Sequence, residues 1–230
     1  MTCHVFERAP VRFLATLAAT GAALATLVSP THAAPAEPGT THTIPVRSLL
    51  DVLPVKDETR DGYQRDAFKH WVDADKDGCS TRKEVLLEEA VNAPGRTGRC
   101  TLTGGTWYSP YDDTYVDGAR GLDIDHLVPL AEAWDSGAGT WTAAEREAYA
   151  NDLDDQRALI AVTAKSNRSK ADQDPTTWQP PASTYRCQYF TDWVTIKSRW
   201  GLAIDPAEQQ ALTNLADACP NEPVTFEQAR

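Results

Sequence analysis

The sequence predicts an α+β fold stabilised by disulfide bonds, and three observations support this prediction. Apolar side chains recur at helical spacing near the C-terminus, at Tyr189, Trp193, Ile196 and Trp200. Residues 99–125 instead alternate Thr, Trp, Tyr and Val between glycines, which is typical of strands. The chain has five cysteines, and all except Cys3 lie in its later part, where an even number suits two disulfides.

The first 33 residues have the features of a secretory signal peptide. Arg8 and Arg12 precede an apolar run from Phe13 to Val28, and small residues follow up to Ala34. A run this short and rich in Ala and Thr is typical of a signal segment and not of a membrane anchor. We therefore expect a secreted, extracellular protein with no membrane association after cleavage near Ala34.

The folded domain is expected to span residues 46–230, after a disordered leader at residues 34–45 that is rich in Pro and Thr. Capping-box patterns, in which Thr is followed three residues later by Glu, mark two helix starts, at Thr81 and Thr142. A short β-like run lies at residues 159–162. Helices are predicted at residues 46–53, 64–71, from 81 onward, 142–153, 189–200 and 206–218.

We favour local disulfide pairing, Cys79–Cys100 and Cys187–Cys219, because both bonds close short loops. Each could contribute about 2–4 kcal/mol of stability. The crossed pairings remain alternatives at the level of sequence.

The chain is strongly acidic, with a formal net charge of −11. This balance argues against tight, sequence-specific duplex binding by a basic face. It does not argue against an enzyme that needs only a local basic groove and a cation. The length suits one domain, and we expect a monomer.

Two short segments together contain a candidate base and candidate oxygen ligands for a metal ion. They are Asp123-Ile124-Asp125-His126 and Asn167-Arg168-Ser169-Lys170. A histidine beside a carboxylate can accept a proton from water, while carboxylate and amide oxygens hold a divalent ion against a phosphate. This combination is typical of a metal-dependent phosphodiesterase. The alternative for His126 is a hydrogen-bonded core histidine with Asp125 at its side.

The run Asp125-His126-Leu127-Val128-Pro129, the residues 130–138 that follow it, and residues 166–175 resemble the secreted HNH-type nucleases of actinobacteria. These are similar to the DUF1524 group and to GmrSD-like HNH endonucleases. The resemblance covers residues 46–215. It implies a ββα-metal core, also called an HNH or His-Me finger, within about residues 100–181 and embedded in further helices.

The resemblance implies that His126 is the general base, and that Asp125 and Asn167 are the metal ligands. It departs from the family pattern at the middle position, where many HNH sequences have an asparagine that orients the loop carrying the base. The corresponding region here is residues 155–159, where either Asp155 or a backbone group must take over this positioning, and no residue is assigned the role.

The metal is expected to prefer oxygen ligands. Outside the signal segment the histidines are only His42, His70 and His126, and the cysteines are expected to be oxidised, so a zinc site with three histidines is excluded. Asp and Asn oxygens suit Mg²⁺ or Mn²⁺, with Ca²⁺ as an alternative. Asp123 lies two residues before Asp125, on the same face of the expected strand, and is a further candidate ligand.

Three cations surround Asn167 in this acidic chain: Lys165, Arg168 and Lys170. They are candidates for binding substrate phosphates. A solvated turn is the alternative interpretation.

A second motif fits the calcium-loop pattern, with carboxylates at Asp73, Asp75, Asp77 and Glu84, a glycine at the sixth position, and the backbone carbonyl of Cys79 at the seventh. A structural Ca²⁺ is therefore a candidate. The alternative is an acidic lead into the helix that begins at Thr81.

Taken together, the residues and the resemblance predict a secreted, metal-dependent endonuclease that cuts DNA with little sequence preference, with RNA as an open second substrate. The alternative from another class is a non-catalytic secreted module stabilised by calcium. A polymorphic toxin nuclease would need a delivery domain, and nothing in the sequence encodes one.

Overall fold

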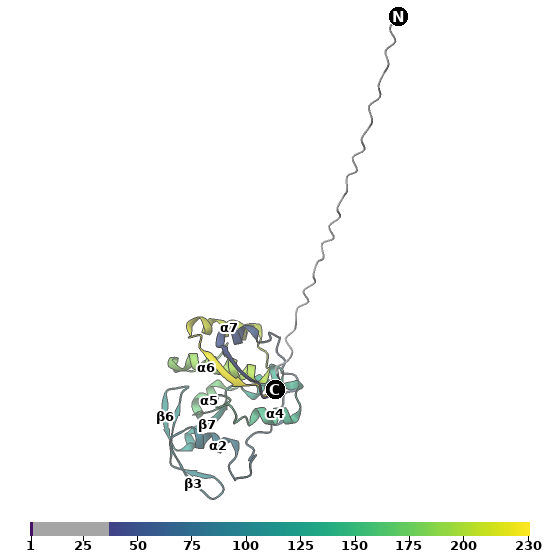
Figure 1. Ribbon diagram of the computed structural model, residues 1–230. Coiled ribbons are helices and arrows are strands. Elements are labelled where there is room, and N and C mark those ends of the chain that lie inside the picture. Colours follow the sequence, from purple (N-terminus) through teal and green to yellow (C-terminus); the bar gives the residue numbers. More distant parts are fainter. Residues whose placement is uncertain (2–36) are drawn as a thin grey trace. The chain divides into compact units, whose positions relative to one another are not determined.

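The structure, a computed structural model, describes Met1 and residues 37–230 (Figure 1). The predicted signal peptide and the beginning of the predicted leader lie outside the described residues. None of the helices in the described part is long and apolar enough to cross a membrane.

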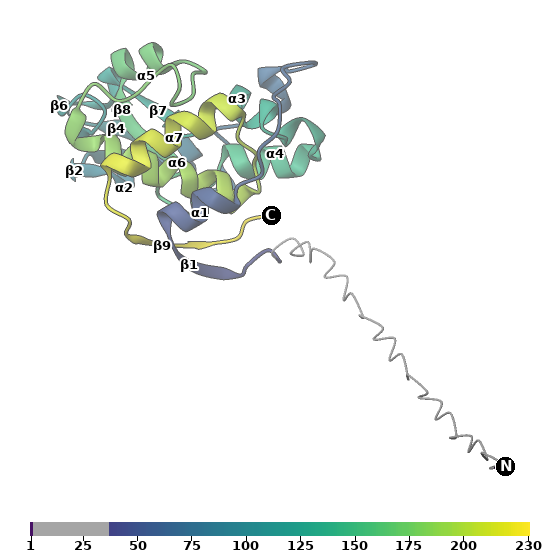
Figure 2. The same ribbon diagram turned by 90° about the horizontal axis from the view of Figure 1, so that it is seen from above.

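The two ends of the described chain pair with each other. β1 (Thr41–Pro45) forms an antiparallel two-stranded sheet with β9 (Pro223–Glu227), and the two strands lie side by side in Figure 2. The imidazole of His42 stacks on Phe226 with ring centroids 5.3 Å apart. The prediction of a disordered leader to residue 45 is therefore wrong for residues 41–45. These residues form a strand because they pair with β9, which is distant in the sequence, and local sequence patterns do not reveal such a pairing.

Three helices pack together beside this sheet: α1 (Val46–Val52), α6 (Arg186–Trp200) and α7 (Pro206–Ala218) (Figure 2). The aromatic face predicted for α6 is buried, and Gly201 ends the helix with a left-handed φ of 63°. α7 begins as expected, with the Asp205 side chain accepting a hydrogen bond from the Glu208 amide and proline in the first turn. The 3₁₀ turn η4 (Ser183–Tyr185) precedes α6.

Short strands lie within the region 99–125 that the sequence predicts to be β, and two further strands precede this region. β2 (Ala90–Asn92), β5 (Thr106–Ser109) and β6 (Thr114–Asp117) form one antiparallel sheet, and β3 (Gly95–Thr97) pairs with β4 (Thr101–Thr103). The indole of Trp107 is fully buried and donates a 2.7 Å hydrogen bond to the carbonyl of Leu86. This bond joins β5 to α2 (Thr81–Glu88).

The candidate site is built on the pair β7 (Leu122–His126) and β8 (Leu159–Thr163). These strands are antiparallel over their full length, with His126 opposite Leu159, and α5 (Ala164–Lys170) follows β8 directly. The chain between the strands forms α3 (Leu130–Asp135), η3 (Ala138–Thr140) and α4 (Ala143–Ala150). η2 (Ala119–Gly121) precedes β7. The arrangement is therefore strand, strand, helix, with a helical insertion.

Two helix predictions need correction. Residues 64–71 contain only the 3₁₀ turn η1 (Arg65–Ala67), because the backbone is extended at Phe68 and left-handed at Trp71, with a φ of 61°. α2 exists as predicted, but Ser80 is its N-cap and the hydroxyl of Thr81 bonds the Val72 carbonyl instead. In contrast, the capping box of Thr142 at α4 is confirmed, although α4 ends at Ala150.

The two disulfides are those favoured from the sequence. Cys79 pairs with Cys100 and Cys187 pairs with Cys219. The first joins the residue before α2's N-cap to the turn before β4, and the second joins the start of α6 to the end of α7.

Candidate functional site

The segments singled out in the sequence meet at one pocket of about 340 Å³. Its lining comes from η1, from the end of β7 and the start of α3, and from α5 with the turn after it. The lining residues are Arg65, Ile124, Asp125, His126, Pro129, Leu130, Asn167, Arg168, Ala171 and Asp172. The structure thus brings four of the predicted site residues together. Lys165 is exposed on α5 and is not part of this lining.

His126 is the last residue of β7, and its ring is fixed in one tautomer. Its Nε2 lies 2.9 Å from the carbonyl oxygen of Ala150 at the end of α4. A carbonyl only accepts hydrogen bonds, so Nε2 carries the proton and Nδ1 keeps its lone pair. Burial lowers the pKa of His126 to about 3, so the imidazole is neutral at physiological pH. His126 therefore has the protonation state that a general base requires.

Two aromatic rings hold the imidazole from the segment after η1. Trp71 lies 5.3 Å from the His126 ring at an interplanar angle of 32°, and His70 lies 6.3 Å away, edge on. Trp71 has a left-handed φ of 61°, which is costly for a bulky residue and is typical of functional sites. Residues 64–71, which do not form the predicted helix, thus supply side chains that pack on His126.

Asn151 connects the two parts of the structure that hold the His126 ring, the Ala150 carbonyl and the segment that carries Trp71. It was not predicted from the sequence as a site residue. Its Oδ1 accepts hydrogen bonds from the Val72 amide at 3.1 Å and the Thr81 hydroxyl at 2.7 Å. Its Nδ2 donates to the carbonyls of Lys69 at 2.8 Å and Glu147 at 2.7 Å. Asn151 therefore fixes the segment that carries Trp71, and it directly follows Ala150, whose carbonyl holds the imidazole.

The region first matched to the middle asparagine has another role. Asp155 forms an ion pair with Arg157, with its Oδ2 2.6 Å from the guanidinium, and Arg157 also donates to the Thr225 carbonyl in β9. The sequence predicts Asn151 to lie inside a helix over residues 142–153, whereas in the structure it is the C-cap residue that directly follows α4. Only the fold shows that this asparagine faces the Lys69–Val72 segment.

Asp125 is buried in a polar cluster. Its Oδ2 accepts a 2.7 Å hydrogen bond from the Tyr111 hydroxyl and lies 2.7 Å from the Lys170 ammonium, which also bonds Oδ1 at 3.0 Å. Lys170 has no exposed surface and donates a further 3.0 Å bond to the His126 carbonyl. This placement differs from the prediction that Lys170 binds substrate phosphate, because its ammonium is enclosed and fully used by Asp125 and the backbone.

Asp123 faces the exposed side of α5. Its Oδ2 accepts a 3.2 Å hydrogen bond from Asn167 and lies 3.7 Å from the guanidinium of Arg168, whose side chain is 78% exposed. Asp123 is therefore near Asn167, as a metal ligand would be, and Arg168 remains open to solvent at the pocket.

The donor set fits a hard divalent cation. Asp125 and Asn167 offer a carboxylate and an amide oxygen on the lining of one pocket. Burial raises the pKa of Asp125, whereas the charge and hydrogen bond of Lys170 and the hydrogen bond of Tyr111 act in the opposite direction. A cation beside Asp125 would also favour the ionised carboxylate.

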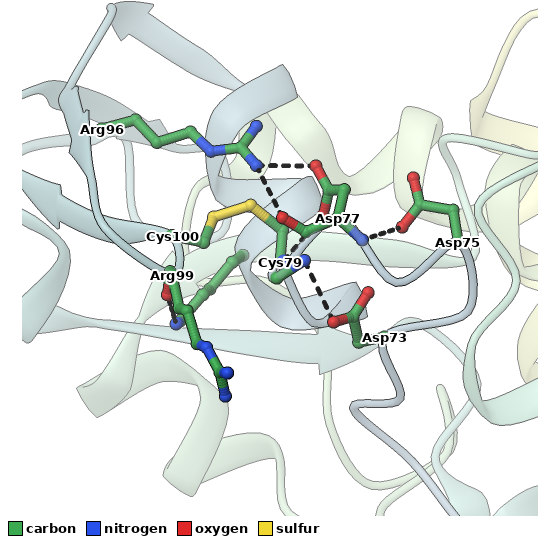
Figure 3. The surroundings of a disulfide bond; sticks show 9 residues. Asp73, Asp75, Asp77, Cys79, Arg96, Arg99 and Cys100 are labelled. Atoms are coloured by element: carbon green, nitrogen blue, oxygen red, sulfur yellow. Dashed lines mark hydrogen bonds and ion pairs between the residues drawn. A yellow bond between two sulfur atoms is a disulfide. The ribbon is translucent and has the colours of Figure 1, made fainter.

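The acidic segment Asp73–Glu84 forms a tight loop next to a disulfide (Figure 3). Carboxylate oxygens of Asp73, Asp75 and Asp77 lie within 4.8 Å of one another, and Arg96 donates to Asp77 at 2.7 Å. Oε1 of Glu84 is buried without a hydrogen-bond partner among the described residues. Burial, followed by the charges of Asp77 and Asp75, raises the pKa of Glu84. The five predicted calcium-loop positions are thus gathered in one loop, which Cys79–Cys100 closes.

Comparisons with known proteins give a consistent result. Residues 59–215 match the family described as GmrSD restriction endonucleases, C-terminal domain. An uncharacterized secreted protein of Arthroderma benhamiae is 39% identical over 208 residues, which cover 90% of this chain and 98% of that protein. No solved structure matches the chain significantly.

Proposed function

We propose, from the premise that this chain belongs to the family of GmrSD restriction endonuclease C-terminal domains, that it is a secreted endonuclease that hydrolyses phosphodiester bonds of DNA. One observation carries the proposal: a neutral histidine with a free Nδ1 lies in the same pocket as a carboxylate and an amide that fit a metal ion. Secretion is supported by a relative over nearly the full chain that is named as a secreted protein.

The strand–strand–helix unit β7–β8–α5 is proposed to be the ββα-metal core of an HNH nuclease. The order and antiparallel pairing of these elements support this assignment, as does the position of His126 at the end of β7 with Asn167 on α5. We propose that the substrate is DNA read with little sequence preference, with RNA as a second substrate, and that the protein acts as a monomer.

The base chemistry follows from the tautomer of His126. Nδ1 takes a proton from a water molecule, and the resulting hydroxide oxygen forms a bond to phosphorus while the bond from phosphorus to the 3′ oxygen breaks. The leaving 3′ oxygen takes up a proton from solvent, so the products are a 5′-phosphate and a 3′-hydroxyl. A Mg²⁺ or Mn²⁺ ion held by Asp125 and Asn167, with Asp123 nearby, would supply positive charge to the phosphate oxygens.

The remaining polar residues keep this arrangement in place. Ala150 holds the His126 ring through Nε2, and Trp71 covers one side of it. Lys170 and Tyr111 orient the Asp125 carboxylate, and Lys170 also binds the carbonyl of His126. Arg168 and Lys165 are exposed cations on α5 and are proposed to contact substrate phosphates.

Replacing the base tests the proposal. His126→Ala should lower the rate of DNA cleavage by roughly 10²–10⁴-fold, because a positioned general base contributes about that factor. The measurement is cleavage of plasmid and single-stranded DNA with EDTA, Mg²⁺ or Mn²⁺, together with thermal unfolding to show that the variant is folded. A folded His126→Ala protein with more than half of the wild-type rate would contradict the mechanism.

A structural Ca²⁺ in the Asp73–Glu84 loop is a second proposal. It is favoured by the buried Glu84 oxygen without a partner beside carboxylates that repel one another. The same loop would be the functional feature if the protein were a non-catalytic calcium-stabilised module, and activity loss in His126→Ala distinguishes the two classes.

A further inference from the structure

Arg65 is a cation at the pocket that forms no ion pair with a carboxylate of residues 37–230, although Asp172 lines the same pocket. It lines the same pocket as His126 and Asp125, and it is exposed. Within residues 37–230, no carboxylate oxygen lies within 4.0 Å of its guanidinium, whereas Arg60 nearby pairs with Asp135 at 2.5 Å. In a chain with a net charge of −11, an exposed and unpaired arginine beside a catalytic pocket is available for an anion.

The backbone holds Arg65 firmly in this position. The Phe68 amide donates a 3.1 Å hydrogen bond to the Arg65 carbonyl, which closes η1. Phe68 is fully buried against the rings of Trp134 and Tyr149, and the Ala67 carbonyl accepts a 3.1 Å bond from Arg146. The turn is therefore pinned on both sides, so the backbone that carries Arg65 needs no ordering when a ligand binds.

The pocket has a buried floor and an exposed rim. His126 and Asp125 are only 6% and 5% exposed, whereas Arg65 and Arg168 are exposed and come from two different elements, η1 and α5. The phosphate that reacts must reach the floor, next to Nδ1 of His126. The phosphates on either side of it in a polynucleotide remain at the rim, where exposed guanidinium groups can bind them.

We propose that Arg65 binds the phosphate of a nucleotide next to the scissile bond, so that the site selects polynucleotides over small phosphodiesters. This inference rests on the proposed nuclease function. Arg168 lies on the same pocket from α5, so the two arginines together would engage the chain from two elements.

Kinetics on two substrates test the assignment. Arg65→Ala should lower kcat/KM for a DNA oligonucleotide roughly 10-fold, mainly through KM, because it removes a charge-assisted contact to the phosphate. A tenfold change corresponds to about 1.4 kcal/mol. The same variant should cleave bis(p-nitrophenyl) phosphate, which has no neighbouring phosphate, at the wild-type rate. Lys56→Ala removes one exposed cation away from the pocket and should leave both substrates unaffected.

Salt dependence of binding gives a readout that does not depend on turnover. In a His126→Ala background, the slope of log Kd against log salt concentration for a labelled duplex should fall by about 0.9 when Arg65 is replaced by Ala, and by about 0.7 for a single strand. Arg65→Lys keeps the charge and should keep most of the slope. This conservative variant also guards against a folding defect in Arg65→Ala.

The outcomes separate the inference from the function on which it rests. Normal DNA cleavage and an unchanged salt slope in Arg65→Ala would overturn the role of Arg65 and leave the nuclease function intact. Equal losses on DNA and on the small diester would also overturn it, because they would place Arg65 on the scissile phosphate. Failure of the wild-type protein to bind or cleave any nucleic acid would overturn both.

Discussion

At the scale of single residues, the buried pair Lys170–Asp125 shows that a residue of a predicted binding motif has a structural role in the fold. The sequence Asn167-Arg168-Ser169-Lys170 presents a cluster of cations, but only Arg168 remains open to solvent in the pocket. The Lys170 ammonium donates its hydrogen bonds to Asp125 and to the carbonyl of His126. Its role in this structure is to position the groups around the base.

Removing Lys170 is therefore expected to destabilise the fold. Lys170→Met should lower the free energy of unfolding by about 3–5 kcal/mol, because the Asp125 carboxylate would remain buried without its partner. Arg168→Met, at the 78% exposed neighbour, should change it by less than about 1 kcal/mol. Urea unfolding of both variants measures the difference. Equal stabilities would show that Asp125 is compensated by another group.

At the scale of elements, the acidic loop and the segment that supports His126 are directly connected. The acidic loop begins two residues after Trp71. It includes Thr81, whose amide and hydroxyl both bond the Val72 carbonyl. Thr81 also donates to Asn151, which follows Ala150. Order in the loop therefore supports the residues that orient the imidazole.

Calcium should stabilise the protein through this loop. An ion that binds only the folded state adds RT ln(1 + [L]/Kd), about 2.7 kcal/mol at a hundredfold excess over Kd. The thermal midpoint of the wild-type protein should rise with Ca²⁺, whereas Asp75→Ala should lose this increment. Asp57→Ala removes an exposed carboxylate outside the loop and should keep it. Equal shifts in all three proteins would mean that the loop is only an acidic lead into α2.

Helix α6 contains a carboxyl group that should make stability depend on pH. Asp192 is 4% exposed and accepts hydrogen bonds from Gln188 at 2.7 Å and Tyr185 at 3.3 Å. Burial raises its pKa to about 7 from an unfolded value near 3.8. The folded protein holds this proton in a range where the unfolded chain has lost it, so the contribution of Asp192 is complete below pH 4 and is lost as pH rises to about 7.

The variant Asp192→Asn removes this titration. Its stability relative to wild type should increase by roughly 4 kcal/mol between pH 4 and pH 8, since each pKa unit corresponds to about 1.4 kcal/mol. Urea unfolding at a series of pH values measures this difference, in which the other titrating groups cancel. Parallel stability curves for the two proteins would show that Asp192 is ionised in the folded state.

At the scale of the whole molecule, patterns confined to one segment were predictable and contacts between distant segments were not. The helix predicted at 189–200, the capping box of Thr142 and the proline start of α7 depend on neighbouring residues. All three are confirmed, although the first helix begins at Arg186. Residues 64–71 have helical spacing, but their aromatic side chains pack on His126, and tertiary contacts outweigh a weak local preference. Strands β2 and β3 have three residues each and few buried ones, so they carry little periodic signal.

The same division applies to the candidate site. His126, Asp125, Asn167 and Arg168 belong to two motifs, and the pairing of β7 with β8 brings these motifs to one pocket. Tyr111, Asn151 and Arg65 come from three further segments that have no motif of their own. Their roles depend on which carboxylate, backbone group or pocket the fold places beside them, and a single sequence does not contain that information.

The pairing of β1 with β9 leads to a prediction about the boundary of the domain. Val224 and Phe226 on β9 are 7% and 5% exposed, and β1 covers the strand from one side, with His42 stacked on Phe226. A chain that begins at Val46 should be less stable than one that begins at Glu37 by roughly 2–4 kcal/mol, because apolar side chains lose their cover at about 1.5–3 kcal/mol each.

A double-mutant cycle makes this prediction specific to the contact. Phe226→Ala should cost about 3–5 kcal/mol in the chain that begins at Glu37, and clearly less in the chain that begins at Val46, because the ring is already partly uncovered there. Glu227→Ala on the exposed side of β9 should cost less than about 1 kcal/mol in both chains. Equal thermal midpoints for the two chains would show that β1 does not contribute to stability. The folded domain would then begin at residue 46, as the Pro-rich composition of residues 34–45 predicts.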